Sequence, residues 1–427
     1  MELTRSSKIA GILLAYPIAY AYLKFFLFDL SDKNVTLKKA VFVLFFIIWN
    51  ELVVRGRGKT PAKETYFWYG IMGIVALTFE TGLSEGVSFL GLHLCAFYVA
   101  IVSNRLCYEG KTGSFIAADL FNAQFLKGFG GMGQIFIDMA HSGRSSAGSS
   151  TQGRRASAAG AFLIILVLIP VFIVAVFLLA QINAGFGAAV MKIVKSFDFL
   201  TDFRWIINNM GYFIFAVPTA MYLYGLLGKS AASNGDAEKR SYGRLVKWRM
   251  SCRRISPVVS ASVTGIFVLL YLVFFIFEAG YLFSAFAGRL PEEFTAAEYA
   301  RRGFFELTGI MFINMMIYLL ISYFEDRELY GRKASVVMTA ALMIESMIFA
   351  VVSFSKLALY YSRFGYTPKR LLAIWGTLIF ASGAVMVIIS TVRRKDMSKA
   401  WILLAAASFA AMSVLSTVLF LTSGGIR

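Results

Sequence analysis

The sequence contains few of the residues from which catalytic and metal sites are usually built. Its 427 residues include two histidines, His93 and His141, which are far apart in sequence. The three cysteines, Cys95, Cys107 and Cys252, have neither the spacing of a disulfide framework nor that of a zinc site. The sequence therefore predicts no metal ion and no other cofactor.

Charged residues are scarce as well. They make up 15% of the chain, whereas a soluble domain carries about 25%. Hydrophobic residues reach 58%, and the mean hydropathy is +0.70. Apolar runs of about 20 residues recur, each long enough to cross a hydrocarbon core about 30 Å thick as a helix. The runs lack the alternation of membrane β-strands. The predicted fold class is all-α, a polytopic transmembrane helical bundle.

These runs predict about eleven membrane spans. With the N-terminus placed inside, the inner loops hold about twice as many Lys and Arg residues as the outer loops. This bias predicts a cytoplasmic N-terminus and a C-terminus outside. The predicted spans cover residues 9–28, 40–54, 66–83, 87–106, 160–180, 210–227, 258–284, 305–323, 334–354, 371–390 and 400–421.

The net charge of +18 does not indicate a nucleic-acid-binding protein. The basic residues lie mainly in short loops, and no basic domain or aromatic stacking platform is present. The predicted cytoplasmic loop 228–257 is the most basic segment, with Trp248 among its cations. Two interpretations of this loop stay open, a binding site for a protein partner and an anchor on anionic lipid. Membrane lipids and such a protein are therefore the expected partners.

Composition divides the chain into three parts. Residues 141–159 are rich in Ser, Gly and Arg and are interpreted as a flexible cytoplasmic linker. The linker separates residues 1–140, with four spans and an interfacial segment, from residues 160–427, with seven spans. A further segment, 184–208, has the pattern of an amphipathic helix on the outer membrane face.

Residues 114–140 form the interfacial segment of the N-terminal part. Polar side chains alternate there with apolar ones, and we expect the segment to lie on the inner membrane face. Its polar residues are Asp119, Asn122, Lys127 and Asp138.

Two glycine-rich segments resemble nucleotide-binding motifs. Residues 128–133 fit G-x-G-x-x-G, but the motif requires a strand before it and a helix after it. We interpret this segment as a hinge or an interfacial turn. Residues 225–230 resemble a phosphate-binding loop, but Leu223 occupies the position of its first glycine. Lys229 is accordingly interpreted as a membrane anchor.

Ionisable residues within spans are costly and therefore informative. Glu345 lies near the middle of the ninth span, and Lys356 is eleven residues further on, about 16 Å along a helix. Two interpretations stay open. The intramembrane charges pair to fix helix packing, or they line a polar vestibule that opens outward with Glu345 at its floor. The other charges lie in the outer third of their spans, and they are Lys24, Glu80, Glu278 and Glu306.

A helix start signal precedes the eighth span. Thr295 and Glu298 have the spacing of a capping box. Glu298, Arg302 and Glu306 follow at intervals of four residues, which predicts a charge ladder on one helix face.

A second start signal precedes the tenth span, where Thr367 is followed by Pro368. Lys369 and Arg370 then fall in the first helical turn, where the helix dipole disfavours cations. We therefore expect Arg370 to pair with Glu298 or Glu306.

The segments Ala297-Glu298-Tyr299-Ala300-Arg301-Arg302-Gly303-Phe304-Phe305-Glu306-Leu307 and Tyr366-Thr367-Pro368-Lys369-Arg370 carry a resemblance. They resemble motifs of a bacterial family of polytopic membrane proteins of unknown function. The resemblance implies a multi-pass helical fold in a bacterial cytoplasmic membrane, and no established activity. The candidate functional residues are Glu278, Glu298, Tyr299, Arg301, Arg302, Glu306, Glu345, Tyr366, Lys369 and Arg370.

Three functions are compatible with these features. Transport of a solute, ion or lipid through an outward-facing polar cavity ranks first, because of the intramembrane charges. A sensory or regulatory membrane subunit that acts through a partner ranks second. A membrane-embedded enzyme acting on a lipid-linked substrate ranks third, because no motif identifies a nucleophile or a metal-ligand set.

Overall fold

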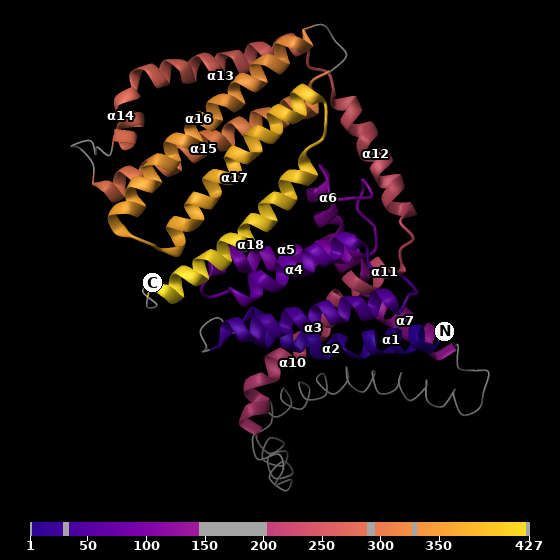
Figure 1. The fold of residues 1–427 in the computed structure, drawn as a ribbon. Coiled ribbons are helices and arrows are strands. Elements are labelled where there is room, and N and C mark those ends of the chain that lie inside the picture. Colours follow the sequence, from indigo (N-terminus) through magenta and orange to yellow (C-terminus); the bar gives the residue numbers. More distant parts are fainter. Residues whose placement is uncertain (1, 29–33, 145–202, 288–294, 327–330, 424–427) are drawn as a thin grey trace, which may run out of the picture. The chain divides into compact units, whose positions relative to one another are not determined.

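The computed structural model describes residues 2–28, 34–144, 203–287, 295–326 and 331–423. Every regular element in these ranges is a helix (Figure 1). An isolated bridge between Ile255 and Glu325 is the one β contact among them. The all-α prediction is therefore confirmed for this part of the chain.

Eight of the helical segments are long and apolar enough to cross a membrane, which indicates a multi-pass membrane protein. Two other predicted spans are helical but do not meet that standard. The span 40–54 lies in α3 (Val35–Arg55), which carries charges near both ends, and 66–83 overlaps α4 (Lys63–Leu77), which has 15 residues. The eight segments are Ser6–Leu27, Glu85–Ser103, Asn209–Ala232, Pro257–Phe277, Ala297–Phe324, Arg332–Phe364, Pro368–Arg393 and Ser398–Thr422.

Three of the predicted segments lie outside the described residues. They are the span 160–180, the linker 141–159 except for its first residues, and most of the amphipathic segment 184–208.

The described chain forms two compact units. Unit 1 comprises Met1–Leu77, Leu92–Leu106 and Ala117–Gly235, and unit 2 comprises Thr78–Gly91, Cys107–Ile116 and Asp236–Arg427.

Among its described residues, unit 1 has eleven helical elements and parts of two more. Its elements are α1 (Glu2–Leu13), α2 (Ala15–Ala21), the π-helix η1 (Tyr22–Leu27), α3, α4, most of α5 (Glu85–Ser103), most of α6 (Ile116–Phe121), the π-helix η2 (Asn122–Gly128), the 3-10 helix η3 (Phe129–Gly131), α7 (Gln134–Arg144), α10 (Phe203–Tyr224), the π-helix η5 (Gly225–Lys229) and α11 (Ser230–Ala232).

The N-terminal helices of unit 1 are joined by aromatic side chains. Trp49 is fully buried, and its Nε1 donates to the Gly11 carbonyl at 2.7 Å, which joins α3 to α1. The Tyr20 ring stacks on Phe213 with centroids 4.8 Å apart, and Tyr16 Oη donates to the Phe213 carbonyl at 3.1 Å. These contacts join α2 to α10.

The two glycine-rich segments pack directly on one another. A Cβ added to Gly131 would lie 2.7 Å from the Gly225 carbonyl oxygen, and one added to Gly225 would lie 2.6 Å from the Gly131 carbonyl carbon. Lys229 Nζ donates to the Gly130 carbonyl at 2.5 Å. These glycines therefore allow close contact between two backbones.

The segment 114–140 does not lie with its polar side chains toward water, as expected for a segment on the membrane surface. Its polar residues Asp119, Asn122, Lys127 and Asp138 are 0–6% exposed, so they do not face water at a membrane surface. Its aromatic residues are exposed instead, and Phe121, Phe125 and Phe129 follow one another with ring centroids 4.8 and 6.1 Å apart. This arrangement suits a segment that is surrounded by lipid.

Unit 2 is organised around one long helix, α16 (Arg332–Phe364), which packs against three others (Figure 1). Half of the most apolar part of α16 is buried, compared with 17–22% in the other long helices of the unit. The other elements are α12 (Asp236–Cys252), α13 (Pro257–Phe277), α14 (Ala279–Phe283), the 3-10 helix η6 (Ser284–Ala287), α15 (Ala296–Phe324), α17 (Pro368–Arg393) and α18 (Ser398–Thr422).

Both predicted helix starts in unit 2 are confirmed. Thr295 Oγ1 accepts from the Glu298 amide at 3.3 Å at the start of α15. Thr367 Oγ1 accepts from the Arg370 amide at 3.4 Å, and Pro368 is the first residue of α17.

The predicted basic loop 228–257 is mainly helical. Its basic residues lie on α12, and Trp248 is 60% exposed. Arg249 joins this helix to α15, because its guanidinium lies 4.7 Å from the centre of the Tyr323 ring and donates to Ser322 Oγ at 3.3 Å.

The glycine contact in unit 1 leads to a prediction about stability. Gly225→Ala should lower the free energy of unfolding by about 1–3 kcal/mol, because its Cβ would overlap rigid backbone. Gly211→Ala in α10 is the matched control, since it has open space around it and should not lower stability. Thermal unfolding in lipid nanodiscs would measure both effects. Equal stability of the two variants would contradict the prediction.

Candidate functional site

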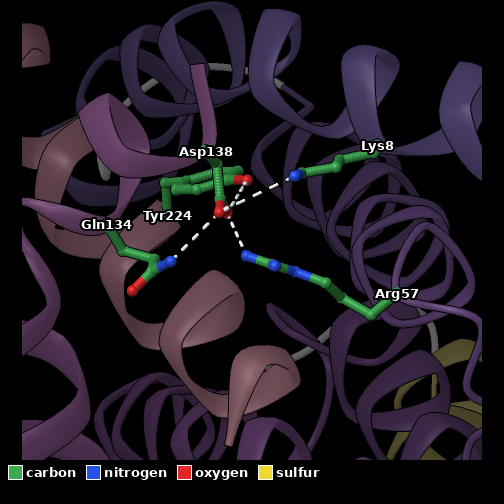
Figure 2. Close-up of polar contacts among 5 residues, drawn as sticks. All are labelled: Lys8, Arg57, Gln134, Asp138 and Tyr224. Carbon is green, nitrogen blue, oxygen red and sulfur yellow. Dashed lines mark hydrogen bonds and ion pairs between the residues drawn. The ribbon is translucent and has the colours of Figure 1, made fainter. Parts of the chain in front are cut away.

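A buried carboxylate lies where four segments of unit 1 meet (Figure 2). Asp138, on α7, is 0% exposed. Its Oδ2 forms an ion pair with the Arg57 guanidinium and accepts from Tyr224 Oη at 2.8 Å. Its Oδ1 accepts from Gln134 Nε2 at 3.1 Å and lies 4.0 Å from Lys8 Nζ. Both carboxylate oxygens therefore have partners.

The local sequence explains how these side chains meet. Gln134 and Asp138 are four residues apart on α7 and so share one face of it. Arg57 follows Gly56, which ends α3 close to α1. A Cβ on Gly56 would lie 2.7 Å from the Lys8 backbone nitrogen, so the glycine allows Arg57 and Lys8 to approach the same carboxylate. We interpret the Asp138 cluster as a set of contacts that stabilises the packing of these helices, because neither oxygen is left open for a ligand.

Unit 1 also contains an apolar cavity of about 350 Å³. Its walls are formed by η1, α3, α5, η3, α10 and η5, with Met72 from α4. Tyr22 and His93 form the principal polar pair in these walls, with Tyr22 Oη 2.8 Å from His93 Nε2. Thr219 and Tyr222 also line the cavity, and Tyr222 Oη donates to the Gln124 carbonyl at 3.2 Å.

The helices around this cavity are irregular. The wall includes the π-helices η1 and η5, and Pro218 interrupts the hydrogen-bond pattern of α10 beside them. π-Helical turns are rare and occur frequently at functional sites. The cavity therefore lies at the least regular part of unit 1.

A second polar site lies in unit 2, around Lys356. This residue is 0% exposed, and its side chain passes over Gly303, where an added Cβ would lie 2.5 Å from Lys356 Cδ. Its Nζ lies 4.3 Å from the centre of the Tyr299 ring, in a cation–π contact. The buried Tyr299 in turn forms a hydrogen bond with Ser284 at 2.7 Å.

Three of the candidate charges lie close enough to Lys356 to interact with it electrostatically. They are Glu306, Arg302 and Glu278. Arg302 Nε donates to Glu306 Oε1 at 2.7 Å, which confirms one step of the predicted charge ladder. The structure thus gathers Tyr299, Gly303 and Glu306 of one sequence motif around a lysine from another helix.

Glu345 lies apart from this group. It is 4% exposed, and neither carboxylate oxygen has a hydrogen-bond partner among the described residues. It interacts electrostatically with Tyr271 of α13. Glu345 lines neither the apolar cavity of unit 1 nor a small pocket of unit 2 that includes Glu325 and Ser335.

The remaining candidates lie at the surface or at helix ends. Tyr366 Oη contacts Ser416 Oγ at 2.6 Å and so joins the start of α17 to α18. Glu298, Arg301 and Lys369 are exposed.

The expected pairing of Arg370 with Glu298 or Glu306 is wrong. Its guanidinium donates to the carbonyls of Phe364 and Gly365 at 2.8 and 2.7 Å and lies 4.2 Å from the centre of the Tyr360 ring. The end of α16 therefore satisfies this cation, because carbonyl groups at a helix C-terminus are negative.

Sequence reasoning did not identify the cavity pair Tyr22 and His93 or the role of Asp138. The sequence pattern favours a surface position for Asp138, although an acidic residue among apolar ones is also the signal of a buried ion pair. Among the described residues, no group of three or more His, Cys, Asp or Glu side chains is placed to hold a metal ion.

Comparison with known proteins places the chain in a family. A family model described as Domain of unknown function (DUF4153) matches residues 70–423. The chain belongs to the DUF4153 family. No curated protein and no solved structure matches it. The DUF4153 match includes Lys356, Glu345 and Asp138, whereas Lys8 and Tyr22 precede it.

The two kinds of ion pair in unit 1 should differ in their contribution to stability. Asp138→Ala should lower the free energy of unfolding by about 3 kcal/mol, because two largely buried cations would lose their counter-ion. Arg55→Ala removes the cation of the pair with Glu51, where Arg55 is 54% exposed, and should cost less than about 1 kcal/mol. Chemical denaturation in detergent would measure both. An equally small decrease in the free energy of unfolding for Asp138→Ala and Arg55→Ala would show that the cluster does not stabilise the packing of unit 1.

Proposed function

We propose that the protein binds a lipid-like amphiphile in the cavity of unit 1 and carries it in the membrane. The observation on which this proposal depends is an apolar cavity of about 350 Å³ in which Tyr22 and His93 form a polar pair. Small-molecule sites in proteins have volumes of about 300–1,000 Å³, mostly apolar walls and a few placed polar groups. The cavity has each of these properties.

The chemistry of the walls favours an apolar ligand. Water is held in protein cavities where polar groups offer it two to four hydrogen bonds. Here most of the wall consists of Phe, Leu, Met and Val side chains. An acyl or isoprenyl chain would fill such a space, and the Tyr22 hydroxyl and His93 imidazole would bind a hydroxyl or ester group at its end. The transport hypothesis is thereby narrowed from a solute, ion or lipid to a lipid.

The irregular helices support movement of the ligand rather than permanent burial. Membrane transporters use interrupted helices beside their substrate sites. Pro218 and the π-helices η1 and η5 supply such interruptions in the cavity wall. Small changes in these segments would open or close the cavity with little disturbance of the rest of unit 1.

We further propose that the protein lies in the cytoplasmic membrane of a bacterium with its N-terminus inside. The excess of Lys and Arg in the loops assigned to the inner side supports this orientation. Under this proposal α12 faces the cytoplasm.

A regulatory subunit that acts through a partner is the second candidate, and α12 is the observation that favours it. Glu238 is its one buried residue, whereas Trp248 and Met250 are about 60% exposed on a basic helix. Exposed aromatic, methionine and arginine residues are typical of interfaces. This candidate also requires α12 to be cytoplasmic.

Photo-crosslinking tests the lipid proposal. Purified protein in nanodiscs would be exposed to a fatty acid that carries a photoreactive group and an alkyne tag, and labelled peptides would be mapped. We expect label in α5 and α10. Ala96→Phe, whose ring would occupy the cavity, should lower this label about tenfold, which corresponds to about 1.4 kcal/mol of binding free energy.

The matched control is Leu94→Phe on the same helix. Leu94 is 39% exposed and does not line the cavity, so its variant should label like the parent protein. Label that is unchanged by Ala96→Phe, or spread evenly over the exposed helices, would refute the lipid site.

Cysteine labelling from either side of the membrane tests the orientation. Single cysteines in α12, for example at Lys239, should react with an impermeant reagent only from the cytoplasmic side. Cysteines at Arg289 and Arg363 should react only from outside. Reaction of α12 from outside would invert the assigned topology and remove the second candidate.

A further inference from the structure

Glu345 is an isolated acid near the middle of a membrane-spanning helix. It follows the start of α16 by 13 residues in a helix of 33, which is about 20 Å from that end. It is 4% exposed, and both carboxylate oxygens lack a hydrogen-bond partner among the described residues. No ion pair with it is formed in this part of the chain.

Few ionisable groups face Glu345 from the helices that pack on α16. α13 contributes Tyr271, which interacts with it electrostatically. Between Leu307 and Ser322, α15 contributes Tyr318 alone, and α17 has no ionisable residue from Leu371 to Val392. η6 has none either. On α16 itself the nearest cation is Lys356, three turns away and seated over Tyr299.

A chain of uncharged polar groups lies next to this acid. Tyr271 Oη donates to Asn314 Oδ1 at 2.9 Å, and Asn314 Nδ2 donates to Ser346 Oγ at 2.7 Å. Ser346 follows Glu345 in sequence, and its hydroxyl donates to the Leu342 carbonyl at 3.1 Å. All three side chains are 0–6% exposed. Such hydroxyl groups both donate and accept, so they can stabilise either form of a neighbouring acid.

The protonation state follows from these surroundings. An ionised carboxylate in an apolar interior requires a counter-ion or several hydrogen-bond donors. Glu345 has neither, whereas the protonated acid requires no counter-ion. Intramembrane acids of this kind mark proton and ion pathways.

We propose that Glu345 is a proton-binding site whose proton exchanges with water while the protein is folded. On release, the O–H bond of the carboxylic acid breaks, its electron pair stays on the carboxylate, and the proton passes to a water molecule that reaches the site. The Tyr271 hydroxyl, which interacts with Glu345 electrostatically, then turns its O–H from Asn314 Oδ1 toward the carboxylate. This site is independent of the lipid cavity, since it lies in unit 2 and shares no residue with the cavity.

Infrared difference spectroscopy on the protein in nanodiscs tests the proposal. A protonated carboxylic acid has a C=O stretch that is separate from the bands of carboxylates and amides. We expect this band at neutral pH, its loss at alkaline pH, and a shift in D₂O within minutes. Glu345→Gln should remove it, and Glu345→Asp should keep it at an altered frequency.

Glu109→Gln is the matched control. Glu109 accepts from Ser114 at 2.7 Å in a segment outside the membrane spans, and its loss should leave the band unchanged. If no such band exists at neutral pH, Glu345 is ionised and the proposal fails. A band that neither shifts in D₂O nor disappears at alkaline pH identifies a sealed structural acid, and it overturns the proposal as well. The spectra of the parent protein and Glu345→Asp decide between these outcomes even if Glu345→Gln does not fold.

Discussion

A carboxylate that is removed from water must find its partners in the protein, and Asp138 finds them in four segments of unit 1. A cation or hydrogen-bond donor comes from α1, from the turn after α3, from α7 and from the end of α10. Removal of any one segment would leave a buried charge with incomplete compensation. One side chain therefore contacts all four segments around α7. Gly56 contributes because it allows α1 and the end of α3 to lie in contact.

The same constraint explains why residues 114–140 are packed with their polar face inward. In lipid, a polar side chain is satisfied only by other parts of the protein. Asp119, Asn122 and Lys127 are accordingly buried, while aromatic rings face outward. The close contact of Gly131 with Gly225 brings this segment against the end of α10. Small residues serve this purpose in membrane proteins because apolar side chains gain little by leaving lipid for protein.

The general fold was predictable because lipid imposes strong rules on sequence. Length and apolarity alone identify the eight spans, and local hydrogen-bonding patterns identify the starts of α15 and α17. The placement of charges was less predictable, because it depends on which helices become neighbours. Arg370 illustrates this. Its expected acidic partner was chosen by side of the membrane, whereas carbonyl groups five and six residues before it in the chain were nearer.

The candidate site was predicted only in part, for a related reason. Ionisable residues in spans are visible in a sequence, so Glu345 and the charges around Lys356 could be selected. The apolar cavity could not, since Leu, Phe and Met residues around a space do not differ in sequence from those in a filled core. Tyr22 and His93 lie 71 residues apart, and no local pattern connects them.

Asp138 and Glu345 show that burial alone does not assign a role to an acid. Both are almost completely buried, and both lie in helices of a membrane protein. Asp138 has a cation or a donor at each oxygen, and these partners come from four segments that its carboxylate holds together. Glu345 has no such partners among the described residues, and the polar groups near it belong to the Tyr271–Asn314–Ser346 chain. A buried acid whose oxygens are all partnered is suited to structure, whereas a buried acid without partners is a candidate for function.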